Sequence, residues 1–318
     1  MNDISNSYRQ VLSDFRIYMK LERNMSENTV TSYLSDCEKL CIFLEDAGID
    51  EPCNITSESL EDFIGSLQKD GISKRSQART ISSIRTFFKY LETERINNNH
   101  PQDRIDSPKI NKYLPVVLSV EEVFSVIESV DLSKPEGHRN RAILETLYSC
   151  GLRVSEVISL KISDLFFDEQ FIRIIGKGNK QRLVPIGEPA IKQILYYMED
   201  RKHIVPAKDC DDILFLNRRG GKLSRVMVFN IVKAQAGAAG ITKEISPHTF
   251  RHSFATHMIE NGADIRVVQE MLGHESILTT EIYTHVNSSK WQESVLVHHP
   301  LSGTAAESTT GESAATAE

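Results

Sequence analysis

The sequence predicts a mainly α-helical protein with a small β-sheet, organised in two domains. Apolar residues recur with helical spacing, behind cap residues, along most of the chain. β-branched and apolar residues concentrate in one pair of short stretches, 171–175 and 181–186. Between the expected domains, residues 97–115 are polar and contain three prolines, which is typical of a linker.

Length and composition are typical of a globular protein. The chain has 318 residues, of which 40% are hydrophobic and 25% are charged. No apolar run approaches the roughly 18 residues of a membrane span, and the first ten residues lack the apolar core of a signal peptide. The five cysteines have no metal-type spacing and are expected to be reduced. We therefore expect a cytoplasmic protein with no membrane partner.

The N-terminal domain, residues 1–97, is expected to consist of helices. Ser26, Thr56 and Ser73 each precede a periodic apolar stretch, as N-cap residues do. Gly48 and Gly71 end the stretches behind Ser26 and Thr56. The expected helices cover 7–21, 26–48, 56–71 and 73–91.

One of these helices carries basic residues with no intervening acid. Arg75 and Arg79 lie on one face, four residues apart. A solvated surface is the more common interpretation of such residues, but the lack of acids favours a face toward DNA phosphates. The net charge of −7 argues only mildly against nucleic-acid binding, because local charge matters more. We predict DNA contacts for Arg75, Arg79 and, at the start of a later helix, Arg225.

Residues 98–113 are expected to form an extended linker, and residues 114–300 a second domain that contains the small sheet. The stretches 171–175 and 181–186, joined by 176–180, predict a β-hairpin. The other expected elements are helices at 119–130, 136–150, 188–203 and 225–239, a short helix beginning at Arg153, a strand at 213–216 and a disordered tail at 301–318.

The stretch from Ser246 to Tyr283 concentrates residues that can perform chemistry. Ser246 and Pro247 predict a helix start. His248 and Arg251, at i and i+3, then project from one face of its first turn. Because the N-terminal end of a helix favours an anion, a phosphate is the expected guest of this pair.

A second helix is predicted within this stretch, from Asp264 to Leu272. Gly273 suits the position that ends such a helix. His274 follows directly, and Tyr283 lies nine residues further on, at the end of a short helical run.

These residues, with two from earlier in the chain, suit phosphoryl transfer to a protein nucleophile. Guanidiniums bind the non-bridging oxygens of a phosphodiester, and the phenol of Tyr283 can attack phosphorus. His248 is a candidate base for this phenol, and Lys177 a candidate acid for the leaving alkoxide. No metal is expected, because the cations are side chains. The six candidate catalytic residues are Arg153, Lys177, His248, Arg251, His274 and Tyr283.

Each candidate also has a structural interpretation when taken alone. A single arginine is most often an ion-pair residue, and a single tyrosine most often packs. His248 and His252 have the spacing of zinc ligands, but Thr249 stands where a zinc protease has glutamate, so we discount a metal site. The glycines around Lys177 do not form a phosphate-binding P-loop, because the required spacing is missing.

The whole pattern resembles the tyrosine recombinase (phage integrase) family. It consists of an Arg after Gly-Leu, a hairpin Lys, H-x-x-R, Leu-Gly-His and a Tyr nine residues later. The resemblance covers about residues 5–300 and is greatest to the Xer group of chromosome-resolving recombinases. It is carried by LERNMSENTVTSYLSD, SCGLRVSEVISL, IGKGNKQRLVPIG, SPHTFRHSFATHMIENGADIRVVQEMLGHESILTTEIYTHV and a final HHP. The polar tail beyond Pro300 departs from the pattern, and we assign it no role.

This resemblance implies a fold, a reaction and partners. A SAM-like helical core-binding domain and a mixed α/β catalytic domain would enclose duplex DNA. Tyr283 would form a 3′-phosphotyrosyl bond and release a 5′-hydroxyl, with no cofactor. Four protomers would exchange strands through a Holliday junction, together with a second Xer recombinase and a translocase of the FtsK type. The segment Ser288–His298 would dock on a neighbouring protomer.

Three other functions stay open at this point. An integrase of a mobile element, or a recombinase that acts without a second one, would keep the chemistry and change the biology. A type IB topoisomerase-like enzyme would relax DNA as a monomer. A DNA-binding protein with an inactive site would bind without cleaving, but the complete set of six residues argues against it.

Overall fold

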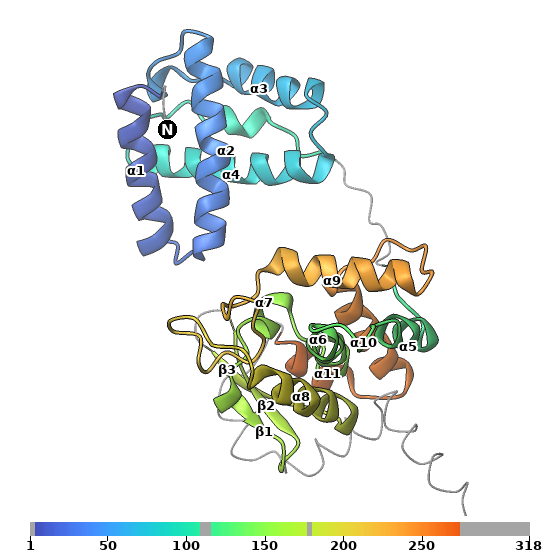
Figure 1. Cartoon of the computed structure of the whole chain (residues 1–318). Coiled ribbons are helices and arrows are strands. Elements are labelled where there is room, and N and C mark those ends of the chain that lie inside the picture. Colours follow the sequence, from blue (N-terminus) through green and yellow to red (C-terminus); the bar gives the residue numbers. More distant parts are fainter. Residues whose placement is uncertain (1–3, 109–115, 177–179, 274–318) are drawn as a thin grey trace, which may run out of the picture. The chain divides into compact units, whose positions relative to one another are not determined.

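The computed structural model describes residues 4–108, 116–176 and 180–273 (Figure 1). The chain divides into two compact units between residues 113 and 114. Both units are mainly helical and the second contains a small sheet, so the predicted fold class is confirmed. Within the described ranges, no helix combines the length and the apolar character needed to cross a membrane.

The first unit is built from helices with hydroxyl caps. These are α1 Asn6–Leu21, α2 Glu27–Asp46, α3 Ser57–Lys69 and α4 Lys74–Thr93. In each, a serine or threonine side chain accepts a hydrogen bond from a backbone N–H of the first turn. The predicted caps of α2, α3 and α4 are confirmed, and Ser5 caps α1. The apolar faces enclose an aromatic core in which Phe15 meets Phe87 edge-on, with 5.1 Å between ring centroids.

Part of the predicted linker packs against this unit. Pro101–Arg104 form a 3-10 helix, and Ile105 behind it is buried. Arg85 donates from Nη2 to the carbonyl of Ile105 at 2.7 Å. The expectation of an extended conformation is therefore wrong for these residues, because Pro101 suits the first turn of a helix and Ile105 fills an apolar site.

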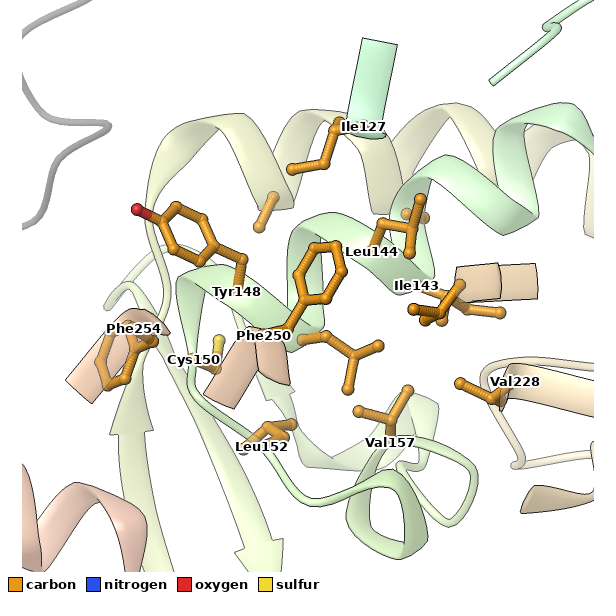
Figure 2. Close-up of a cluster of buried hydrophobic side chains, with 14 of the residues drawn as sticks. Ile127, Ile143, Leu144, Tyr148, Cys150, Leu152, Val157, Val228, Phe250 and Phe254 are labelled. Atoms are coloured by element: carbon orange, nitrogen blue, oxygen red, sulfur yellow. The ribbon is translucent and has the colours of Figure 1, made fainter. Parts of the chain in front are cut away.

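The second unit is arranged around a buried helix, α6. Its helices are α5 Val120–Glu128, α6 Gly137–Ser149, α7 Val154–Val157, α8 Glu188–Arg201, α9 Arg225–Ala238, α10 Pro247–Glu260 and α11 Ile265–Leu272. Leu144 and Tyr148 of α6 lie against Phe250 of α10 in the apolar core (Figure 2). A helix covered on most of its sides must present apolar residues around its circumference, as residues 142–148 of α6 largely do.

The sheet of the described residues has the order β1-β2-β3, with both pairs antiparallel. Its strands are β1 Leu165–Phe166, β2 Phe171–Ile175 and β3 Gln181–Pro185. The predicted hairpin is confirmed, whereas β1 was not predicted. The strand expected at 213–216 is wrong: Ile213 and Leu216 make only isolated bridges, to Lys161 and Lys222. That run is apolar because it is buried, not because it pairs along its length.

The alternation of β3 places an arginine on the buried face of the sheet. Arg182 lies opposite Ile174, and Val184 lies opposite Ile172. All four side chains point into the core, whereas Leu183 between them is exposed. An ionised side chain at such a position requires a charged partner.

Candidate active site

Gly151 sets the position of Arg153 by reversing the chain after α6. Its φ of +58° lies in the left-handed region, and a Cβ built on it would overlap the ring of Phe254. Two residues later, Arg153 occupies the N-cap position of α7. Its backbone N–H donates to Glu156 Oε2 at 2.8 Å, which holds the first turn of this short helix together.

Replacing Gly151 with Ala should lower the free energy of unfolding strongly. The left-handed backbone costs a non-glycine residue about 1–3 kcal/mol, and the overlap with Phe254 adds about 1–3 kcal/mol. Gly240→Ala is the matched control, because Gly240 has φ +72° but nothing within 4 Å of a built Cβ. Urea denaturation should give a clearly larger loss for Gly151→Ala, and equal losses would contradict the close packing.

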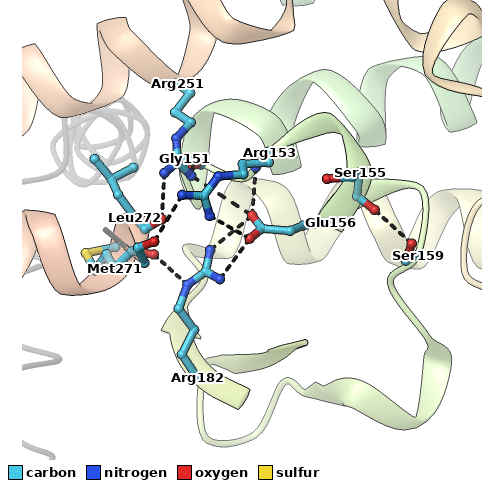
Figure 3. Close-up of polar contacts among 10 residues, drawn as sticks. Gly151, Arg153, Ser155, Glu156, Ser159, Arg182, Arg251, Met271 and Leu272 are labelled. Atoms are coloured by element: carbon cyan, nitrogen blue, oxygen red, sulfur yellow. Dashed lines mark hydrogen bonds and ion pairs between the residues drawn. The ribbon is translucent and has the colours of Figure 1, made fainter. Parts of the chain in front are cut away.

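The carboxylate of Glu156 is the centre of a charged cluster (Figure 3). Arg182 binds both of its oxygens, with Nη1–Oε1 2.8 Å and Nη2–Oε2 3.0 Å. Arg153 donates from Nη1 to Oε1 at 3.1 Å, and Arg251 brings Nη1 to 4.0 Å from Oε2. The side chain of Glu156 is 4% exposed, so this buried carboxylate is satisfied by charge-assisted hydrogen bonds.

The same arginines bind the last carbonyls of α11. Arg182 Nε donates to Met271 O at 2.8 Å, Arg251 Nη2 to Leu272 O at 2.5 Å and Arg153 Nη2 to Gly273 O at 3.0 Å. Helix C-termini leave such carbonyls unsatisfied and carry partial negative charge. The cations therefore stabilise the end of α11, and α11 in turn orients them.

Arg251 lies near the start of α10, and its side chain is buried, with 8% of its surface exposed. It also donates from Nη1 to Gly151 O at 2.7 Å. Burial, followed by the charge of Arg153, lowers the pKa of Arg251 to about 10, against the opposing effect of Glu156. The group remains charged at neutral pH, and an added phosphate anion would relieve this destabilisation.

Opposing effects act on the buried Glu156. Burial alone would raise the pKa of this carboxyl. The hydrogen bonds and charge of Arg182, supported by Arg153, outweigh burial and leave the pKa lowered. The carboxylate is therefore ionised at neutral pH and holds its arginines as an anion.

His248 lies in the first turn of α10 with an exposed side chain. Partial burial lowers its pKa, and the positive charges of His252, Arg251 and Arg153 lower it further. At neutral pH the imidazole is thus neutral and able to accept a proton. Further along α10, His257 is buried, with Nδ1 2.9 Å from the hydroxyl of Tyr148.

Of the six predicted catalytic residues, Arg153 and Arg251 meet at Glu156. His248 precedes Arg251 by three residues on α10, where partial burial and the charges of both arginines lower its pKa. Lys177, His274 and Tyr283 lie outside the described residues. The strands on either side of Lys177 and the residue before His274 are described, however. The strands β2 and β3 flank Lys177, and the carbonyl of Gly273, which binds Arg153, directly precedes His274. Gly273 has φ +63°, which confirms the predicted left-handed helix end.

The predicted DNA-contacting arginines differ in their surroundings. Arg75 on α4 and Arg225 at the start of α9 are exposed. Arg79 donates from Nη2 to Oδ1 of Asp36 at 2.8 Å, and Asp36 is buried. Half of the Arg79 side chain stays exposed, so one guanidinium can orient on Asp36 and still face a phosphate. DNA contact stays a prediction for all three.

Two residues of the cluster, Glu156 and Arg182, were not among the predicted ones. Glu156 follows Arg153 by three residues, the spacing at which a side chain in the first turn can return to the cap. Arg182 breaks the apolar alternation of β3 on its inward face. Both patterns are visible in the sequence, but neither reveals that the two side chains meet.

In the described part of the chain, no group of three or more His, Cys, Asp or Glu residues is placed to hold a metal ion.

Known proteins resemble this chain in sequence and in structure. Residues 117–290 match the phage integrase family and residues 12–95 its N-terminal SAM-like domain. Tyrosine recombinase XerD of Chlorobaculum tepidum is 44% identical over 296 residues, which cover 92% of this chain and 97% of that protein. Tyrosine recombinase XerD of Staphylococcus saprophyticus is 40% identical over 290 residues, 91% of this chain and 98% of the relative.

A solved structure also matches most of the chain. The XerH site-specific recombinase bound to its difH substrate, in a pre-cleavage complex, has a TM-score of 0.66 and 26% identity. The match covers 88% of this chain and 83% of that one.

The chain belongs to the phage integrase family, and it is a site-specific DNA recombinase of the tyrosine class. Within that class it is similar, over most of its length, to the proteins named tyrosine recombinase XerD. The stretch NGADIRVVQ and the motif HHP at residues 298–300 look more like XerD than XerC.

Proposed function

We propose that this recombinase resolves chromosome dimers in the cytoplasm of dividing cells. The similarity to proteins named XerD over more than nine-tenths of the chain supports this role. Four protomers, two of them a second Xer recombinase, would exchange strands through a Holliday junction. A septal translocase of the FtsK type would control them, and the segment Ser288–His298 would link neighbouring protomers.

One observation carries the proposed chemistry: Arg153 and Arg251 meet at Glu156, and Arg153 also binds the carbonyl of Gly273, the residue before His274. The two guanidiniums bind the scissile phosphate and stabilise the charge of the transition state. The phenol oxygen of Tyr283 attacks phosphorus as its proton passes to His248. The bond from phosphorus to the 5′-oxygen breaks. His274 would contact the same phosphate.

Lys177 is the proposed acid that protonates the departing 5′-oxygen. A substrate with sulfur at this bridging position has a good leaving group that needs no proton. We therefore expect Lys177→Ala to cleave normal DNA at least about 100-fold more slowly than the unmodified protein, a typical contribution of general acid catalysis, but to cleave the sulfur substrate at a nearly normal rate. Quenched single-turnover reactions on both substrates measure this difference. Lys180→Ala, on the same hairpin, is the control and should cleave both normally.

Equal defects of Lys177→Ala on the two substrates would contradict the role of an acid. Lys177 would then act in binding, for example by contact with a base edge.

Covalent trapping on genomic DNA tests the biological role. Fragments that carry a protein adduct after denaturation are sequenced from cells that produce the recombinase. A single adduct position on the chromosome, with recombination that depends on a second Xer recombinase, is the expected result. Adducts at the ends of a mobile element would instead identify an integrase. Adducts at many positions, with relaxation of supercoiled plasmid by a monomer, would identify a topoisomerase-like enzyme.

A further inference from the structure

Arg182 is more deeply embedded in the charged cluster than Arg153. Its side chain is 9% exposed, whereas that of Arg153 is 37% exposed. Three of its N–H groups are used: two bind the oxygens of Glu156 and Nε binds the carbonyl of Met271. Such a two-point contact fixes both the position and the plane of the carboxylate.

Glu156 passes this orientation on to Arg153. The carboxylate oxygen that accepts from Arg182 Nη1 also accepts from Arg153 Nη1, and the other oxygen accepts from the backbone N–H of Arg153. Without Arg182, the carboxylate of Glu156 could rotate about its own side-chain torsions. The more exposed guanidinium of Arg153 would then be held firmly only at Nη2, by the carbonyl of Gly273.

The same guanidinium joins two segments that lead to other catalytic residues. Arg182 belongs to β3, which follows Lys177, and it binds the last turn of α11, which precedes His274. A Cβ built on Gly273 would lie 3.2 Å from Cζ of Arg182. Glycine at this position therefore allows the close contact as well as the left-handed backbone.

We propose that Arg182 is a positioning residue for strand cleavage. Acting through Glu156, it holds Arg153 in the direction that binds the scissile phosphate. This inference deepens the proposed function and rests on the role given there to Arg153.

The test compares Arg182→Lys with a matched control, Arg173→Lys. Arg173 lies on the neighbouring strand and also binds a buried carboxylate, with Nε 2.7 Å from Asp164 Oδ1, but it does not take part in the Glu156 cluster. Lysine keeps the charge in both variants. Arg182→Lys loses the two-point contact with Glu156, whereas Arg173→Lys loses a single bond to Asp164. Cleavage is measured in single turnovers on a nicked duplex whose sequence comes from the covalent trapping.

We expect Arg182→Lys to cleave about 10- to 100-fold more slowly, the usual range for a displaced supporting residue. DNA affinity and the folded fraction should stay near normal, and Arg173→Lys should cleave normally. A normal cleavage rate for Arg182→Lys would overturn the proposal.

A second substrate separates positioning from general support. In a methylphosphonate, a methyl group replaces the charged non-bridging oxygen of the scissile phosphate. This substrate carries no negative charge there, so the positive charge of Arg153 matters less to its cleavage. The defect of Arg182→Lys should shrink on this substrate at least about tenfold, in parallel with that of Arg153→Lys. An equal defect on both substrates would assign Arg182 to structure alone and overturn the inference.

Two further variants keep the outcomes distinct. Should Arg182→Lys fail to fold, Glu156→Gln retains the shape of the side chain without its charge, and it should reproduce the same substrate-dependent defect. If Arg153→Lys cleaves both substrates normally, the proposed role of Arg153 fails, and the inference with it. If Arg153→Lys shows a defect that shrinks on the methylphosphonate and neither Arg182→Lys nor Glu156→Gln shows the same pattern, only the inference about Arg182 fails.

Discussion

Tyr283→Phe should abolish the covalent protein–DNA complex and leave DNA binding intact. The change removes one oxygen, the proposed attacking atom, and keeps the aromatic ring. The buried Tyr148 and Tyr197 are poor alternatives, because burial raises the pKa of each phenol. The measurement is a denaturing gel after incubation with a nicked duplex that traps the adduct, with affinity measured on the intact duplex.

Tyr148→Phe is the matched control for this experiment. It makes the same chemical change on α6, where the hydroxyl contacts His257, and the variant should still form the adduct. An adduct that survives Tyr283→Phe would contradict the assignment of the nucleophile.

Arg251→Ala should reduce the rate of DNA cleavage by at least about 100-fold, as expected when a preorganised donor to the transition state is lost. Affinity for DNA should change little, because binding is spread over many phosphate contacts. Single-turnover cleavage at saturating protein separates the two quantities. A decrease in cleavage that only follows a decrease in affinity would mean that Arg251 holds DNA without acting on the reaction.

The variant also loses structural contacts, so its control must lose similar ones. Arg139 on α6 is buried and donates from Nη1 to Leu216 O at 3.1 Å, away from the Glu156 cluster. Arg139→Ala should therefore reduce stability while the folded protein cleaves normally. Circular dichroism gives the folded fraction by which both rates are corrected.

The helices of the chain could be predicted from the sequence because their determinants are local. Cap residues and apolar spacing identified α2, α3 and α4, and the β-branched pair identified β2 and β3. The misassigned strand at 213–216 and the missed β1 have a different cause. Residues 213–216 are apolar because distant elements bury them, not because they form a strand. Strand β1 has only two residues, which is too short to show a periodic pattern.

The sequence predicted candidate residues for the site but not how they are organised. Arg153, His248 and Arg251 are candidates because their offsets form a recognisable pattern, and two of them, Arg153 and Arg251, lie in the cluster around Glu156. Glu156 and Arg182 were missed, although Glu156 has the spacing of a capping residue and Arg182 breaks the apolar alternation of β3. Their shared role depends on a contact between residues 26 positions apart. A long-range ion pair leaves no periodic trace in one sequence.

The hydrogen bonds around Glu156 have a consequence for how the DNA target can change. The described contacts of this cluster run between residues 151 and 273 within one unit, and none includes Arg75 or Arg225. Exposed positions on α4 and on the first turn of α9 can therefore vary without removing any of these contacts. With the predicted DNA contacts of Arg75 and Arg225, target choice and the proposed chemistry would be separately mutable, which suits directed evolution of this scaffold toward new recombination sites.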